Sequence, residues 1–138
     1  MRDGAGEPSV VRNEPLLPDG TPMPTRFWLV DPELRRRVDQ LEAAGGVRRA
    51  GVEVDPAALE DAHARYAAER DAAIPAAHTG ARPFGGVGGT RRGVKCLHAH
   101  YAWFLAGGDD PVGRWVHEEL RSTARPAGSM APVRQSRP

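Results

Sequence analysis

The sequence has a single cysteine, a single lysine and no long apolar run. With Cys96 alone among 138 residues, an intrachain disulfide is excluded. No apolar segment reaches the roughly 18–20 residues that a membrane-spanning helix needs, and the N-terminal residues lack the apolar stretch of a secretory signal. The formal net charge of +1 is not the basic excess typical of nucleic-acid-binding domains. We therefore expect a cytoplasmic protein with no membrane insertion and no nucleic-acid partner.

Large apolar residues are also scarce. Leu, Ile, Val and Phe together account for 25 residues, whereas Gly and Pro account for 29. A low apolar content indicates disorder chiefly when net charge is high, and here the charges balance. The length predicts one domain. We expect a single globular domain over residues 9–121, with disordered ends at residues 1–8 and 122–138, because the ends show no apolar periodicity.

Local signals predict an α+β fold that is mainly helical, with about four helices after a small N-terminal β-hairpin. Residues 18–20 (Pro-Asp-Gly) predict a turn, and the apolar residues 26–30 predict a strand that pairs with Val10-Val11. Three Asp-Pro pairs combine an N-cap acceptor with a proline at the first helical position, which predicts a helix start at each. The expected helices run from residue 32 to Gly45-Gly46, from 56 to about 73, from about 94 to 107, and onward from 111. On the second of these, His63 shares a face with apolar residues, which predicts a packing role satisfied by one or two hydrogen bonds.

The segment from 85 to 113 concentrates the residues that could bind a ligand. Five of the nine residues from 85 to 93 are glycines, and the loop leads into a helix N-terminus, where free N–H groups favour an anion. Lys95 is the only lysine against 18 arginines, and its compact ammonium differs from a guanidinium in size and titration. The leading hypothesis is a binding module for a phosphate-bearing small molecule or an anionic partner. Its contacts would be Gly88, Gly89, Arg91, Arg92, Gly93, Lys95 and Asp110.

Two simpler interpretations remain open for this segment. The glycines do not follow the spacing of a P-loop, and a loop of this length is also compatible with a mobile surface segment. The carboxylates of Asp109 and Asp110 could face the loop arginines, but capping of the next helix explains them more economically.

Cys96, His98 and His100 are the candidate catalytic residues of a second hypothesis, a Cys/His-dependent or metal-assisted enzyme. On a regular helix Cys96 lies about 40° from His100 and about 160° from His98. This geometry predicts that Cys96 pairs with His100, as nucleophile and base or as two ligands of one metal. A single cysteine fits a structural zinc site poorly, so no metal is expected; if one binds, its ligands would be Cys96, His100 and Asp31. A buried packing thiol is the alternative.

A third hypothesis is a protein-interaction subunit that uses an exposed Trp103 or Trp115. The sequence identifies no cofactor.

Several blocks of the sequence resemble the domain-of-unknown-function 501 family of actinobacteria. They are Asp-Gly-Thr-Pro-Met-Pro-Thr at 19–25 with Phe-Trp-Leu at 27–29, Lys-Cys-Leu-His at 95–98, and Gly-Gly at 107–108 followed by Pro-Val-Gly at 111–113. The resemblance covers about residues 9–120 and implies no established activity. The family pattern commonly places Cys-Pro after the aromatic strand, where this chain has Asp31-Pro32. A two-cysteine redox mechanism is thereby excluded, whereas Asp31 keeps the N-cap role and could act as an oxygen ligand.

Overall fold

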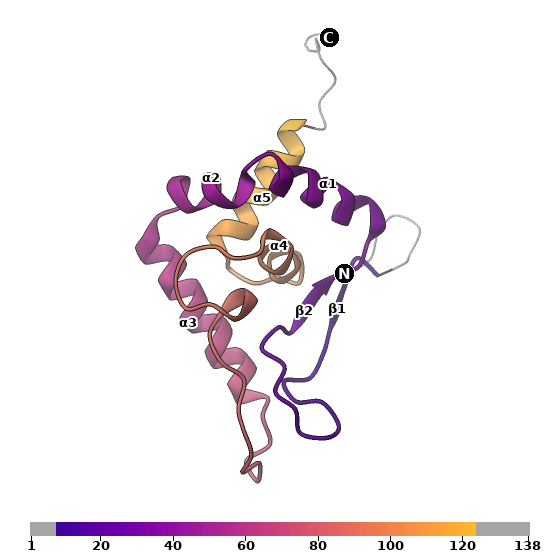
Figure 1. The fold of residues 1–138 in the computed structure, drawn as a ribbon, viewed down its shortest axis with the longest axis vertical. Coiled ribbons are helices and arrows are strands. Elements are labelled where there is room, and N and C mark those ends of the chain that lie inside the picture. The colour runs from indigo at the N-terminus through magenta and orange to yellow at the C-terminus, as the bar shows by residue number, and fades with distance from the viewer. Residues whose placement is uncertain (1–7, 124–138) are drawn as a thin grey trace.

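The computed structural model describes residues 8–123, which form a mainly helical α+β fold (Figure 1). Strands β1 (Val10–Arg12) and β2 (Phe27–Leu29) pair antiparallel, with Val10 opposite Leu29. The α-helices are α1 (Pro32–Ala43), α2 (Gly46–Glu53), α3 (Pro56–Ala72), α4 (Leu97–Leu105) and α5 (Pro111–Thr123), and a 3-10 turn, η1, spans Val87–Gly89. The expected fold class and hairpin are confirmed, with five helices in the described residues in place of about four.

The three Asp-Pro helix starts lie where the sequence predicts them. Asp31 accepts a hydrogen bond from the Leu34 backbone N–H at the start of α1. Asp55 accepts from the Ala58 N–H at the start of α3. In the same way Asp110 accepts from the Val112 N–H at the start of α5. Each carboxylate satisfies a backbone donor that the first helical turn leaves free.

The predicted end of the first helix at Gly45-Gly46 is confirmed, because Gly45 adopts a left-handed conformation (φ 88°) that ends α1. Helix α2, which begins at Gly46, is not among the expected helices. Two other boundaries differ from the expected ones. The helix expected from about residue 94 begins at Leu97, because Cys96 is extended (φ −145°, ψ 116°). Finally, α5 continues to Thr123, two residues beyond the expected domain end at 121. The rest of the expected disordered tail, and residues 1–7 of the expected disordered N-terminus, lie outside the described residues.

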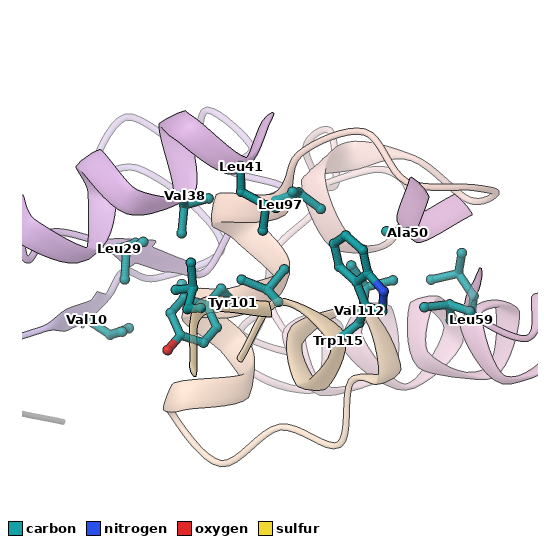
Figure 2. Packing of buried hydrophobic residues seen from close by; sticks show 14 residues of the cluster. Val10, Leu29, Val38, Leu41, Ala50, Leu59, Leu97, Tyr101, Val112 and Trp115 are labelled. Carbon is teal, nitrogen blue, oxygen red and sulfur yellow. The ribbon is translucent and has the colours of Figure 1, made fainter. Parts of the chain in front are cut away.

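Helix α4 is the centre of the fold and packs against α5, β2, α1 and η1 (Figure 1). Leu97 and Tyr101 of α4 lie between Val38 of α1 and Val112 of α5 in the main apolar cluster (Figure 2). Because both ends of α4 are tied into this core, the residues at its N-terminus are held against α1 and β2. In residues 8–123, no helix combines the length and the apolar character that crossing a membrane requires.

Trp103 and Trp115 belong to this interior. They are 2% and 8% exposed, so the hypothesis of an interaction surface built on either one is wrong. Trp28 of β2 and Phe84, which precedes the glycine loop, are the aromatic side chains at the surface, with 46% and 59% exposure. Helical spacing alone did not show that α4 and α5 bury their tryptophans against each other and against neighbouring helices.

Candidate functional site

His63 of α3 anchors the glycine loop. Its ring is 3% exposed; Nδ1 accepts a hydrogen bond from the Val87 N–H at 3.0 Å, and Nε2–H donates to the Gly93 carbonyl at 2.9 Å. Burial lowers the pKa of His63 from its usual value, which favours the neutral ring that these two bonds require. A Cβ on Gly86 would lie 2.6 Å from His63 Nδ1, so only glycine lets the loop approach α3 this closely. The loop is therefore packed onto the domain at both ends.

The anchored loop separates two clefts. The larger, of about 520 Å³, lies between β2, the start of α1 and the residues that lead into α4. The smaller, of about 400 Å³, lies between α3 and residues 83–92. Gly88, whose φ of 68° suits glycine, lines the larger cleft together with Lys95, Cys96 and His98. Arg91 and Arg92 line the smaller one.

The structure therefore does not gather the residues of the predicted anion site in one place. Lys95 and Gly88 lie at one cleft, and the two arginines at the other. The Arg91 guanidinium stacks over the exposed Phe84 ring, 4.0 Å from its centroid. Gly93 is engaged through its carbonyl by His63, and Gly89 continues the 3-10 turn.

The N-terminus of α4, where the sequence favours an anion, already contacts a carboxylate of the protein itself. The Leu97 N–H donates to Glu42 Oε2 at 2.9 Å, a bond that joins α4 to α1. A carboxylate is the charge that the positive end of the helix dipole prefers. An external anion at this point would have to displace Glu42.

Cys96, His98 and Asp39 form a connected chain of polar atoms at the same corner. Cys96 Sγ lies 3.9 Å from His98 Nδ1, and His98 Nε2–H donates to Asp39 Oδ1 at 2.7 Å. Glu42 Oε2 lies 3.3 Å from the same Nδ1 atom. The prediction that Cys96 faces His100 and not His98 is wrong, because Cys96 is the extended residue before the helix and helical spacing does not apply to it.

The local charges perturb both reactive groups. The hydrogen bond with Cys96, followed by the charge of Glu42, raises the pKa of His98 to about 9. Burial is the largest single influence on the Cys96 thiol and raises its pKa, but the hydrogen bonds with His98 and with the Ala99 backbone, together with the charge of His98, bring the net pKa below the usual value. Each shift favours the charged form of its group, the thiolate of Cys96 and the imidazolium of His98.

His100 and Asp110 have a structural environment instead. Both are fully buried, and His100 Nδ1 bonds Asp110 Oδ2 at 2.7 Å. The His100 ring also contacts the His63 ring edge-on, with centroids 5.6 Å apart. Asp31 is occupied in capping α1. The group of potential metal ligands that the described residues bring together is Glu42, Cys96 and His98, and not the expected set of Cys96, His100 and Asp31.

Sequence reasoning missed both acidic members of this site. Asp39 and Glu42 are three residues apart and so share a face of α1, which is the only local signal they carry. Nothing in the sequence indicates that this face meets the start of α4, because the contact depends on how α1 and α4 pack.

The structure is thus a small α+β domain with a polar site at one corner. The site consists of a half-buried thiol and imidazole, two carboxylates beside them and an adjoining cleft. The chain belongs to the family described as protein of unknown function (DUF501), whose sequence model matches residues 1–118. No curated protein and no solved structure shows a significant match to the chain.

Proposed function

We propose that the protein binds an anionic small molecule in the larger cleft, between β2 and the start of α4, with Lys95 and Arg35 as the contacts for its negative group. The supporting observation is that both cations line this cleft. Neither forms an ion pair with an acidic residue within residues 8–123. Asp39 lines the cleft too, but its carboxylate is engaged by His98. The two cations are therefore available to an anion.

The opposite wall of the cleft favours a ligand that also has an apolar or aromatic body. Phe27, Trp28 and Leu29 of β2 line this wall. The Trp28 indole N–H donates to the Asn13 side chain, which holds the exposed ring in place. A volume of about 520 Å³ is within the range of roughly 300–1,000 Å³ typical of small-molecule sites. A phosphate or carboxylate attached to such a body fits these features.

Thermal-shift measurements with phosphate, pyrophosphate and nucleotides test the proposal. A ligand at 100 times its Kd stabilises the folded state by about 2.7 kcal/mol. Lys95→Ala and Arg35→Ala should each reduce this stabilisation and leave the unliganded melting temperature nearly unchanged, because both side chains are at the surface. Arg91→Ala, at the smaller cleft, is the matched control and should respond as the wild type does. Equal shifts in Lys95→Ala and wild type would refute the proposal, and a loss confined to Arg91→Ala would place the ligand in the smaller cleft.

A second candidate function is catalysis by the thiol. Cys96, His98 and Asp39 have the order of a nucleophile, its general base and an acid that orients the base. The distances of 3.9 Å and 2.7 Å along this chain support that assignment, as does the position of Cys96 at a helix N-terminus. The pH dependence of Cys96 alkylation tests it.

A further inference from the structure

We propose that Glu42, Cys96 and His98 together bind one zinc ion at the wall of the larger cleft. The proposal goes beyond anion binding and does not depend on it. It begins from the convergence of three electron-pair donors: a sulfur, a ring nitrogen and a carboxylate oxygen, all within 4.8 Å of one another. The side chains of His98 and Glu42 are 24% and 28% exposed, so the site is sheltered and still reachable from solvent.

Two of the three separations between these atoms are close to those around a tetrahedral zinc ion, and the third, between Cys96 Sγ and Glu42, is at most 4.8 Å. With Zn–S near 2.3 Å and Zn–N or Zn–O near 2.0–2.1 Å, a sulfur and a nitrogen ligand lie about 3.6 Å apart, and a nitrogen and an oxygen ligand about 3.4 Å. The observed values are 3.9 Å between Cys96 Sγ and His98 Nδ1 and 3.3 Å between His98 Nδ1 and Glu42 Oε2.

Hydrogen bonds to other residues orient two of the three proposed ligands, His98 and Glu42, toward the centre of the site. Asp39 accepts from His98 Nε2–H at 2.7 Å, so Nδ1 is the nitrogen that faces Cys96 and Glu42 and that a metal would bind after displacing its proton. A carboxylate in this position is the usual outer partner of a metal-binding histidine. Glu42 Oε2 in turn accepts from the Leu97 N–H, which fixes the carboxylate relative to α4.

The donor set and its charge select the metal. Zinc accepts sulfur, imidazole and carboxylate ligands, whereas magnesium and calcium take oxygen ligands almost exclusively. The thiolate of Cys96 and the carboxylate of Glu42 carry two negative charges, which a divalent ion neutralises. Three protein ligands also leave a coordination position for water or a cleft ligand, the arrangement of catalytic zinc sites.

The ligands are held by two elements that pack against each other. Glu42 belongs to α1, and Cys96 and His98 flank the first residue of α4. Val38 and Leu41 of α1 lie in the same apolar cluster as Leu97 of α4. The site is therefore built before any metal arrives, which favours a defined coordination geometry.

Metal analysis of the full chain, purified without an affinity tag or chelator, tests the proposal. We expect about one zinc per chain. After removal of zinc by a chelator, added cobalt(II) should produce a thiolate-to-cobalt absorption band, and added zinc should protect Cys96 from alkylation. Cys96→Ser and His98→Ala should abolish the band, and Asp39→Asn should weaken zinc binding about 10–100-fold. His78→Ala is the histidine control and should bind zinc normally, because His78 bonds the Ala81 carbonyl in its own loop.

Glu42→Gln separates a loss of zinc binding from a loss of folding, because its amide oxygen can still accept from the Leu97 N–H while the negative charge is removed. It should bind zinc more weakly and unfold near the wild-type temperature. Folded wild-type protein that carries no zinc, gives no cobalt band and gains no protection from added zinc would overturn the proposal. Lys95→Ala should retain its zinc. Failure of the anion proposal would appear as missing stabilisation by phosphate in a protein that still binds metal.

Discussion

Replacing Gly86 with alanine should destabilise the protein through one contact between the glycine loop and α3. The new Cβ would lie 2.6 Å from both Cβ and Nδ1 of His63 and 2.8 Å from its Cα. These atoms belong to the base of a buried side chain on a regular helix and cannot rotate away. The loop must therefore move, and the hydrogen bond from the Val87 N–H to His63 moves with it.

Overpacking of this kind costs about 1–3 kcal/mol, and the upper end applies if the buried Val87 N–H loses its partner. Urea unfolding followed by tryptophan fluorescence measures the change. With an m-value of about 2 kcal/mol/M, a loss of 2 kcal/mol lowers the midpoint by about 1 M. Gly51→Ala is the matched control: its Cβ meets nothing within 4 Å inside α2, and alanine should raise stability by about 0.5–1 kcal/mol. If Gly86→Ala unfolds at the wild-type midpoint, the loop does not pack on α3 as described.

The remaining predictions concern two titrating side chains. In chelator-treated protein Cys96 should alkylate with an apparent pKa below the usual value of about 8.5, and His98→Ala should raise that pKa, because the imidazole lowers it in the native protein. A Cys96 that reacts only in denaturant would refute the thiol as a nucleophile. The folded pKa of His63 lies below its unfolded value of about 6.5, so the unfolded chain binds more protons between the two. The contribution of His63 to the free energy of unfolding should be fully present above pH 6.5 and should decrease below it by at most about 1.4 kcal/mol per pH unit. Urea midpoints across pH 5–7.5 measure this decrease. A steeper decline in His63→Asn than in the wild type would contradict the prediction.

Features of the fold that depend on residues adjacent in the sequence could be predicted from the sequence. Each Asp-Pro pair carries a cap acceptor and a preset first residue within two positions, and all three begin a helix as expected. The hairpin follows from an apolar strand and a Pro-Asp-Gly turn in the same way. Helix α2 could not be predicted, since its eight residues contain two glycines and it begins at the second glycine of a pair that ordinarily ends a helix. Its buried Ala50 packs in the core, so tertiary contacts override weak local propensity.

The candidate site shows how a shift of two or three residues in one boundary changes the chemistry. If the helix began near residue 94, Cys96 would lie on the side of His100. Because the helix begins at Leu97, the extended Cys96 directs its thiol to His98, while His100 is committed to the buried Asp110. The sequence could identify the three reactive residues, but the pairing among them depends on a backbone angle.

Glu42 has the larger effect, because it reverses the charge preference of the site. A helix N-terminus preceded by glycines and cations favours an anion when considered alone. Glu42 reaches that N-terminus from α1 and satisfies the Leu97 N–H, and Asp39 binds the outer nitrogen of His98. Two carboxylates and a thiol surround one imidazole, so these groups stabilise a positive charge at this position. Either a proton on His98 or a bound metal would supply that charge. The anion that we propose would instead contact Lys95 and Arg35, which line the cleft outside this corner.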